Sequence, residues 1–381
     1  MLTRRSLLRS LPAVAFLPRV LCAADAPLHN LLIGTGTGGS SNSKGIYIAE
    51  WSADGKIGEI SLSAELSSPT FMALDRHARH LYAISEVREG RVTAFSVGYG
   101  KNHMLKLNRL NEQTAEGNGP AHVSINVDGR SAFVSNYGSG SLTSYKVELS
   151  GALSAPVSHF QYMPIDDLPE HAHPHAHEAT PSPDGHSLLV NDLGSDRIWS
   201  YRINRSTGAL TPSDPGFWQG RFKSGPRHLV FHPNGRWVYN ANELDSTVDH
   251  LVWNNKESTL TTQGTFVSTL PANYPIGTST ASEIITSPDG RFVYVGNRGN
   301  ETVAKFDVNA VSGKLTLSQL APHGGKSARH IALDPTGQFL LVACQDSDNI
   351  VILSRDPVSG RLSDPLHTYP IGSPQCLIFT T

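Results

Sequence analysis

Residues 227–243 read Arg-His-Leu-Val-Phe-His-Pro-Asn-Gly-Arg-Trp-Val-Tyr-Asn-Ala-Asn-Glu: an apolar run, a Pro-Asn-Gly turn, a bulky second run and a polar end. Proline presets the first dihedral angle of a tight turn, and glycine supplies the positive φ that the turn needs. The flanking runs contain the β-branched and aromatic residues that favour buried strands. The stretch therefore predicts a β-hairpin.

The same pattern recurs along the chain. It returns as Asn-Val-Asp-Gly-Arg at 126–130, Ser-Pro-Asp-Gly-His at 182–186, Ser-Pro-Asp-Gly-Arg at 287–291, Asp-Pro-Thr-Gly-Gln at 334–338 and, without its glycine, at 75–79. Successive turn glycines from 129 to 337 lie 56, 50, 55 and 47 residues apart. Each hairpin is followed by a third apolar run, such as 302–308, and by a further turn. Four strands in about 50 residues are typical of one β-propeller blade.

The number of blades follows from the length. Six hairpins are visible, and the 355 residues from 27 to 381 accommodate seven repeats of about 51 residues. The segment 372–379 resembles the start of a repeat whose remaining strands lie near 30–35, so the two chain ends are expected to share one sheet. The prediction is an all-β fold: a seven-bladed β-propeller of four-stranded antiparallel blades, closed by pairing of the N- and C-terminal segments, which leaves no open edge on the ring.

The first 26 residues are set apart from this fold. Arg4 and Arg5, followed by a short apolar run at 11–17, resemble a twin-arginine export signal, with small residues at 24–26 for cleavage. The run is too short to span a bilayer. The alternative is a basic amphipathic helix. We expect residues 1–26 to be a signal peptide, residues 27–381 to be the propeller, and the protein to be exported, most simply to the periplasm.

Composition excludes several classes of protein. Charged residues make up 17% of the chain, with 31 Lys and Arg against 33 Asp and Glu. Removing residues 1–26 takes away four arginines and one aspartate, leaving a net charge of −5. No basic block remains, so neither nucleic acid nor a membrane is an expected partner. Cys344 and Cys376 are the cysteines outside the signal, and two free thiols are expected. We expect a monomer or a weak homo-oligomer.

Polar residues recur eight positions before and after the turn glycines. Residues at these two positions face each other across a regular hairpin, at the end opposite its turn. The expected pairs are Arg227 with Glu243, Ser282 with Arg298, Arg329 with Gln345, His177 with Leu193, and Ala121 with Tyr137. In the repeat whose turn lies at 75–79, Glu86 takes the position after the turn. If these strands are the inner ones, their side chains converge at one mouth of the central channel. The alternative is that Arg227 and Glu243 form only a solvated ion pair.

Several phrases resemble the seven-bladed lactonase family, which includes propeller-type 6-phosphogluconolactonases and a fungal carboxymuconate-cyclising enzyme. They are Gly34-Thr35 with Ser43-Lys44-Gly45-Ile46-Tyr47, Pro174-His175-Ala176-His177, Asn191-Asp192-Leu193-Gly194-Ser195-Asp196-Arg197, Gly225-Pro226-Arg227-His228, Asn242-Glu243-Leu244, Asn297-Arg298-Gly299 and Ala328-Arg329-His330. The resemblance covers the chain beyond the signal. It implies lactone hydrolysis, with His177, Glu243, Arg227 and Arg298 as candidate catalytic residues. Cys344 stands where family members commonly have asparagine, which puts one ligand-orienting amide in doubt.

Lactone opening requires an activated water, stabilisation of an oxyanion and a proton for the leaving alkoxide. His177 or Glu243 is the candidate base, and His177 is preferred because Glu243 beside Arg227 suits charge pairing better. Arg227 and Arg298, with Arg329 behind them, would hold the oxyanion and any anionic group of the substrate. The further candidate substrate-binding residues are Arg329, Gln345, His175, His228, Asp192, Asn242 and Asn297.

Other readings remain open. The alternating histidines of 171–177 could bind zinc, but no separate ligand set accompanies them, so neither a metal nor another cofactor is expected. A small-molecule lactone is the expected partner, and export favours an unphosphorylated sugar-acid lactone over a phosphorylated one. One alternative function is a lyase that forms a muconolactone with the same residues. Another is a propeller that binds a ligand without catalysis.

Overall fold

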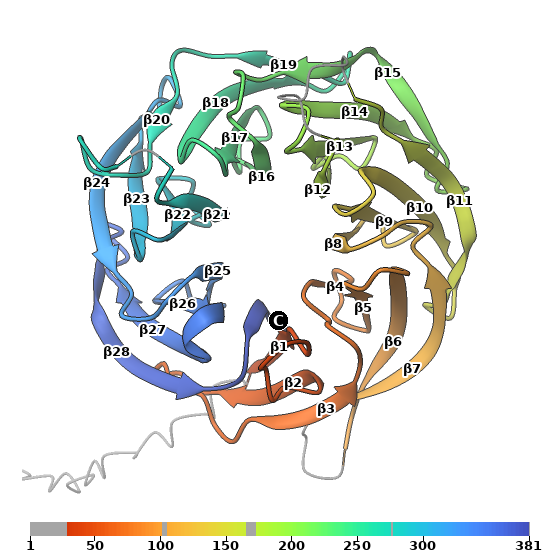
Figure 1. The fold of residues 1–381 in the computed structure, drawn as a ribbon, viewed down its shortest axis with the longest axis horizontal. Coiled ribbons are helices and arrows are strands. Elements are labelled where there is room, and N and C mark those ends of the chain that lie inside the picture. The colour runs from red at the N-terminus through yellow and green to blue at the C-terminus, as the bar shows by residue number, and fades with distance from the viewer. Residues whose placement is uncertain (1–28, 101–104, 165–172, 276, 381) are drawn as a thin grey trace, which may run out of the picture.

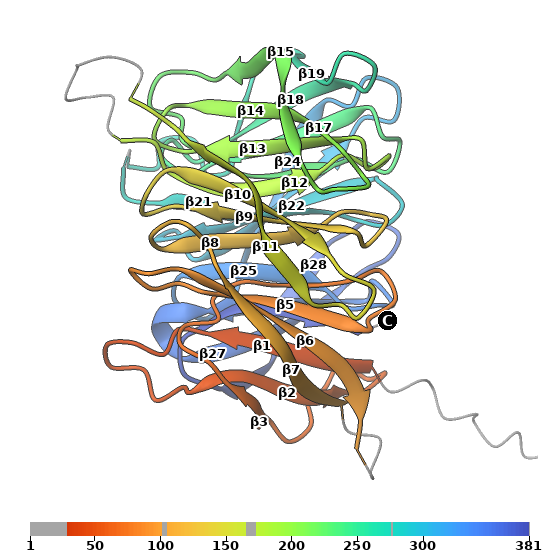
Figure 2. The same ribbon diagram turned by 90° about the vertical axis from the view of Figure 1, so that its right-hand side faces the viewer.

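The computed structural model describes residues 29–100, 105–164, 173–275 and 277–380. Its strands form seven antiparallel sheets arranged as blades around a central axis, as the sequence predicts (Figure 1). Figure 2 shows the same ring from its side. The predicted signal peptide lies outside the described residues. Among the residues that are described, no helix is long and apolar enough to cross a membrane.

Blades 1 to 4 are numbered in chain order. Blade 1 contains β29 (Pro374–Phe379), β1 (His29–Thr35), β2 (Gly45–Trp51) and β3 (Ser61–Glu65). Blade 2 contains β4 (Met72–Leu74), β5 (His80–Ser85), β6 (Arg91–Tyr99) and β7 (Leu105–Thr114). Blade 3 contains β8 (Pro120–Ile125), β9 (Ser131–Asn136), β10 (Ser141–Val147) and β11 (Leu153–Gln161). Blade 4 contains β12 (Ala176–Pro181), β13 (Ser187–Asp192), β14 (Arg197–Ile203) and β15 (Leu210–Gln219).

Blades 5 to 7 continue the ring. Blade 5 contains β16 (Pro226–Phe231), β17 (Trp237–Asn242), β18 (Thr247–Asn254), β19 (Thr259–Thr262) and β20 (Val267–Ser268), the last paired with β18. Blade 6 contains β21 (Thr280–Thr286), β22 (Phe292–Arg298), β23 (Thr302–Val308) and β24 (Leu315–Pro322). Blade 7 contains β25 (Ala328–Leu333), β26 (Phe339–Cys344), β27 (Asn349–Arg355) and β28 (Leu362–Pro370), with the 3₁₀ turn η1 (Gln345–Ser347) after β26.

The ring closes in blade 1, where the two ends of the chain pair. β29 lies antiparallel to β1, with Leu32 opposite Ile378 and Ile33 opposite Leu377. In Figure 1 the C-terminal strand sits beside the first strand at the inner side of the ring. The predicted closure is therefore confirmed, because the two ends of the chain share one sheet.

The hydrophobic core is divided among the interfaces between blades. The buried apolar residues of the described chain form seven clusters, and each cluster draws its members from two adjacent blades. Cys344 and Cys376 are both buried and unpaired, as expected. Because every blade is buried against two others, the inner strands are held firmly enough to position side chains in the channel.

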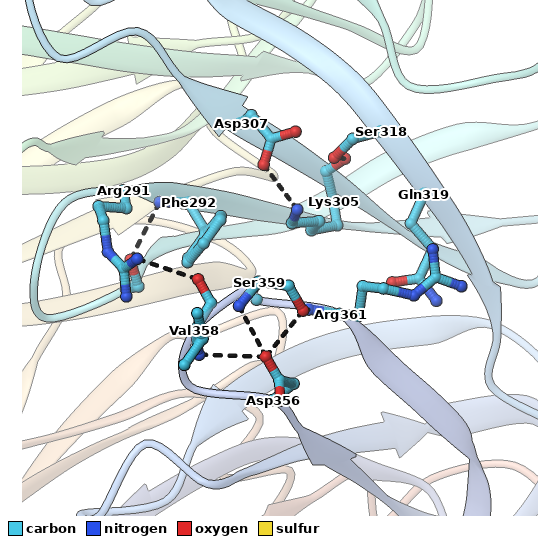
Figure 3. A network of polar contacts seen from close by, with 12 residues as sticks. Arg291, Phe292, Lys305, Asp307, Ser318, Gln319, Asp356, Val358, Ser359 and Arg361 are labelled. Atoms are coloured by element: carbon cyan, nitrogen blue, oxygen red, sulfur yellow. Dashed lines mark hydrogen bonds and ion pairs between the residues drawn. The ribbon is translucent and has the colours of Figure 1, made fainter.

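Polar contacts also join neighbouring blades at the face that carries the hairpin turns. Tyr239 Oη donates to Gly313 O at 2.8 Å, from blade 5 to blade 6. Figure 3 shows the equivalent region between blades 6 and 7, where Arg291 Nη1 donates to Val358 O at 2.9 Å. We call the blade ends opposite these turns, where Arg227, Glu243 and Arg298 lie, the polar rim. The bonds between blades are at the other face, so they bear on stability and not on the channel mouth.

Candidate active site

Each of several inner strands carries a β-bulge near the end that reaches the polar rim. In blade 5, Pro226 lies opposite Asn242 and the next paired residue is His228, so Arg227 is an extra residue in the strand. Corresponding irregularities leave extra residues at Ala121, His177, Ser282 with Glu283, and Arg329. A bulge bends its strand and redirects its side chains.

The bulges change the register that the sequence suggested. Regular hairpins would place Ser282 opposite Arg298, but Thr280 takes that place. Likewise, Pro226 and not Arg227 faces the end of β17. That part of the sequence interpretation is wrong for two reasons: the hairpin is centred before Gly235, since Phe231 pairs with Val238, and the bulge then adds one more residue of offset. The inserted residues nevertheless reach the channel.

All seven blades contribute to one small cavity, which must therefore lie on the central axis. Its lining residues are Thr70, Phe71, Ala121, His177, Arg227, His228, Glu283, Arg329 and Gln375. Four of the predicted catalytic or substrate-binding residues that carry ionisable groups thus meet there: His177, Arg227, His228 and Arg329. They come from three different blades, and their convergence requires the closed ring.

Glu243 is held between two arginines at the mouth of this cavity. Its Oε2 lies 3.0 Å from Arg227 Nε and 2.9 Å from Arg298 Nη2. Arg227 is only 2% exposed, and its Nη1 has no hydrogen-bond partner within the described residues. Arg298 also donates to the main-chain oxygen of Ala281 at 3.0 Å. A buried guanidinium group with a free donor is suited to binding an oxygen anion.

Positive charge exceeds negative charge at this point. Burial, together with Arg329 and Arg298, lowers the pKa of Arg227 to about 9, so the group remains protonated at neutral pH. Burial alone would raise the pKa of Glu243, but Arg298, Arg227 and Arg329 outweigh it and lower that pKa. Glu243 is thus an anion that partly neutralises three cations. Glu86 interacts electrostatically with Arg329 and accepts a hydrogen bond from Thr70 Oγ1 at 2.6 Å.

His177 is a neutral imidazole in this cationic environment. It is 3% exposed, and burial together with Arg227, His228 and Arg329 lowers its pKa well below 6.5. Its Nδ1 lies 3.1 Å from His228 Nε2, and the Tyr137 ring lies edge-on with its centroid 5.6 Å away. A neutral imidazole can accept a proton, which a protonated one cannot.

Beneath this layer, the residues that follow the bulges fill the channel. This plug consists of Phe71, His122, Glu178, His228, Glu283 and His330. Burial lowers the pKa of each of its three histidines and raises that of Glu178 well above 4.5. These pKa shifts favour the neutral forms of the three histidines and of Glu178, so the plug carries little charge although it contains five ionisable side chains. The plug closes the floor of the cavity.

Three predicted substrate-binding residues are placed away from the cavity. Asp192, Asn242 and Asn297 are fully buried within their blades. Asp192 accepts hydrogen bonds from the His175 main chain at 2.7 Å and from Trp199 Nε1 at 3.1 Å. Protein partners occupy their polar groups, and they do not line the cavity, so their direct contact with a substrate stays a prediction.

The two amides are engaged in the same way. Asn242 donates to Thr247 Oγ1 at 3.0 Å and to Asp249 Oδ2 at 2.8 Å. Asn297 donates to the Thr269 main-chain oxygen at 2.8 Å and accepts from Thr269 Oγ1 at 2.7 Å. The bonds of Asn242 fix the turn that follows β17 and carries Glu243, and those of Asn297 tie the end of β22, where Arg298 lies, to the segment after β20. Both amides therefore shape the site without lining it.

Two of the remaining candidates, His175 and Gln345, lie around the mouth, and the third, His228, belongs to the plug. His175 stacks on Tyr137 with ring centroids 4.4 Å apart, and its Nδ1 lies 2.9 Å from the Tyr137 main-chain oxygen. Gln345 begins η1 and is half-buried, with its main-chain N–H bonded to Ser327 O at 3.0 Å. His228 is buried with one nitrogen against His177 and the other against Glu283. Sequence reasoning missed Glu283 as a site residue, although it occupies the same repeat position as His228.

A larger cleft of about 1000 Å³ opens beside the cavity. Tyr137 and His175 form part of its wall, together with apolar side chains that include Leu193, Leu244 and Phe266. Tyr137 therefore lies between this cleft and the candidate base, since its ring also contacts His177. Within the described ranges, no group of three His, Cys, Asp or Glu side chains is arranged to hold a metal ion. His171 of the alternating histidine run lies outside those ranges.

A closed seven-bladed ring with a polar cavity on its axis defines a propeller of the ligand-binding or enzymatic class. The family model "Lactonase, 7-bladed beta-propeller" matches residues 30–379. The chain belongs to this family, and it is accordingly a lactone-hydrolysing enzyme.

Two kinds of relative support the assignment. A 6-phosphogluconolactonase of Bacillus subtilis is 33% identical over 291 residues, which cover 74% of this chain and 78% of the relative. The structure of a periplasmic gluconolactonase from Pseudomonas aeruginosa matches with a TM-score of 0.86 at 30% identity, covering 93% of this chain and 99% of that one. A putative 6-phosphogluconolactonase from Bacteroides fragilis matches with a TM-score of 0.83 at 29% identity, covering 94% and 99%.

Proposed function

We propose that the protein hydrolyses a sugar-acid lactone at the mouth of the axial cavity, with His177 as general base. The observation that carries the proposal is a neutral, buried imidazole beside three arginines. Imidazole accepts the proton of a water, and the arginines stabilise the negative charge that develops on the carbonyl oxygen. Glu243 holds Arg227 and Arg298 in place, which agrees with its lowered pKa.

The chemical step balances without a cofactor. Water loses a proton to His177 Nε2 while its oxygen forms a bond to the lactone carbonyl carbon. The carbonyl electrons move to the oxygen, which Arg227 and Arg298 stabilise. When the carbonyl reforms, the ring C–O bond breaks and the leaving alkoxide takes the proton from His177. The product is the open-chain hydroxy acid, and the imidazole is neutral again.

An unphosphorylated aldonolactone is the proposed substrate, and the cell exterior or periplasm is the proposed location. The twin-arginine-like sequence of residues 1–26 supports export. The name of the Pseudomonas aeruginosa relative, a periplasmic gluconolactonase, supports both parts. The arginine cluster would also accept an anionic substituent, so a phosphorylated lactone is the comparison substrate.

The test compares His177→Gln with wild type on gluconolactone, 6-phosphogluconolactone and a muconate, by acid release for the lactones and by ultraviolet absorbance for the muconate. We expect lactone turnover to fall about 100-fold or more in the variant. His186→Gln is the matched control, because His186 lies exposed at the turn face of the same blade. Unchanged turnover in a folded His177→Gln protein would refute the role of His177. Activity on the muconate alone would favour the lyase.

A further inference from the structure

One buried side chain, His228, connects His177 to the carboxylate of Glu283 on the next blade but one. Glu283 Oε2 lies 2.9 Å from His228 Nδ1, and His228 Nε2 lies 3.1 Å from His177 Nδ1. The three residues come from β21, β16 and β12, so the chain of contacts crosses blades 6, 5 and 4. The three residues are far apart in the sequence, so only the fold brings them into contact.

The contacts fix which nitrogen atoms carry protons. A carboxylate only accepts hydrogen bonds, so the proton between Glu283 and His228 belongs to His228 Nδ1. A neutral His228 then has a lone pair on Nε2 and accepts from His177 Nδ1–H. His177 Nε2 is consequently left with a lone pair, and none of the described residues donates to it. That nitrogen is the one that a base needs.

We propose that Glu283 and His228 are positioning residues that hold His177 with Nδ1 protonated and Nε2 free to accept a proton from water. The proposal rests on the proposed function of His177. As His177 takes a proton on Nε2, the positive charge of its ring is stabilised through His228 by Glu283. Neither positioning residue forms or breaks a bond to the substrate.

We call the hydrogen-bonded series Glu283, His228 and His177 the relay. The surrounding structure holds its side chains in fixed positions. His228 is 1% exposed and Glu283 8% exposed. Ser282 Oγ donates to the main-chain oxygens of Gly296 and Ala328, which anchors the bulge that carries Glu283. The Phe71 ring packs edge-on against His228 with centroids 5.9 Å apart. Rings held in this way keep their orientation while a substrate enters and leaves.

Other charges around the relay come from every blade packed against it. The titratable and charged groups that face the two histidines or Glu283 are Tyr137 and His122 of blade 3, Glu178 of blade 4, Arg227 and Glu243 of blade 5, Arg298 of blade 6, and Arg329 and His330 of blade 7. The cations among them lower the pKa of His177, and Glu283 is the anion that touches its hydrogen-bonded partner. Replacing Glu283 by an amide leaves all these groups present.

The first experiment is Glu283→Gln, assayed for lactone hydrolysis across pH. We expect kcat to fall roughly 10-fold or more with KM nearly unchanged, and the acidic limb of the kcat/KM profile to move to lower pH. The shift has this sign because removing a carboxylate makes the histidine pair easier to deprotonate. A loss of stability alone would change the amount of folded enzyme without moving the limb.

Glu178→Gln is the matched control. Glu178 is another buried carboxyl group of the plug, and burial raises its pKa well above 4.5, which favours the neutral form that an amide resembles. Its Oε2 accepts from Leu229 N–H at 2.6 Å, which an amide oxygen can also do. We expect the acidic limb of the kcat/KM profile of Glu178→Gln to coincide with that of wild type.

The second experiment observes the histidine tautomers directly and leaves Glu283 in place. Nitrogen-15 spectra of histidine-labelled wild-type protein at neutral pH report the tautomer of each ring, and His177→Gln and His228→Asn spectra assign the two signals. We expect both rings to carry their proton on Nδ1. A proton on His177 Nε2, or an unmoved acidic limb in Glu283→Gln, would overturn the relay. If His177→Gln is inactive in the same assays, the proposed function would stand without it.

Discussion

The buried histidines at the axis predict a steep loss of stability in mild acid. Burial lowers the pKa of His122, His177, His228 and His330, and Arg227 lowers it further in each case. In the unfolded chain these rings titrate near pH 6.5. Their stabilising contribution is therefore complete above pH 6.5 and falls as the pH drops toward the lower values of the folded protein.

The magnitude follows from the number of groups. Each imidazole changes the free energy of unfolding by about 1.4 kcal/mol per pH unit, so four give ~5 kcal/mol per unit. Glu178 acts in the opposite sense, because its raised pKa lets the folded protein keep a proton that the unfolded chain loses above pH 4.5. It offsets one imidazole. From these five groups the loss between pH 6 and 5 is on the order of 3–4 kcal/mol, a large part of the 5–15 kcal/mol typical of a folded protein, and the lowered pKa values of His250 and His323 add to it.

Urea unfolding at pH 7.5, 6.0 and 5.0 measures this slope. In His122→Asn one titrating ring is absent, so the slope should decrease by about 1.4 kcal/mol per pH unit. His186→Gln removes an exposed ring at the turn face and should leave the slope unchanged. A loss below about 1.4 kcal/mol between pH 6 and 5, equivalent to one proton, would refute the view that these imidazoles are buried as neutral groups.

Three further outcomes follow from other parts of the structure. Glu243→Gln leaves Arg227 and Arg298 without their shared anion and should lower the free energy of unfolding by about 3–5 kcal/mol at pH 7.5. Because the pKa of Glu243 is lowered, this difference from wild type should disappear only in acid, and a loss under 1 kcal/mol by urea titration at neutral pH would contradict the pairing. Tyr239→Phe removes the bond to Gly313 between blades and should cost about 1 kcal/mol in the same titration with kcat/KM unchanged. Dialysis against a chelator should leave lactone hydrolysis unchanged, and loss of activity restored by a divalent ion would reverse that expectation.

The sequence predicted the ring because its information is local and repeated. The turn of residues 232–235 carries the proline and glycine that a hairpin needs, and copies of it at regular spacing leave few other folds. The pairing of the chain ends followed from counting strands. Side chains after the strands were harder to interpret: Asp192 and Asn242 look like ligands in sequence, but they are hydrogen-bond anchors inside the blades. A polar residue type does not reveal whether its partner is a substrate or the protein.

The bulges were unpredictable from the sequence for a physical reason, and they decide the site. In a regular strand Arg227 and His228 would point to opposite faces, and only one of them could reach the cavity. An extra residue in the ladder places both along it, one bonded to Glu243 and the other to His177. Such an insertion is tolerated because the inner strand has no further strand beside it toward the axis. One repeated irregularity thus produces two layers of side chains, a cationic mouth above a plug, and burial between them beside the arginines keeps His177 neutral.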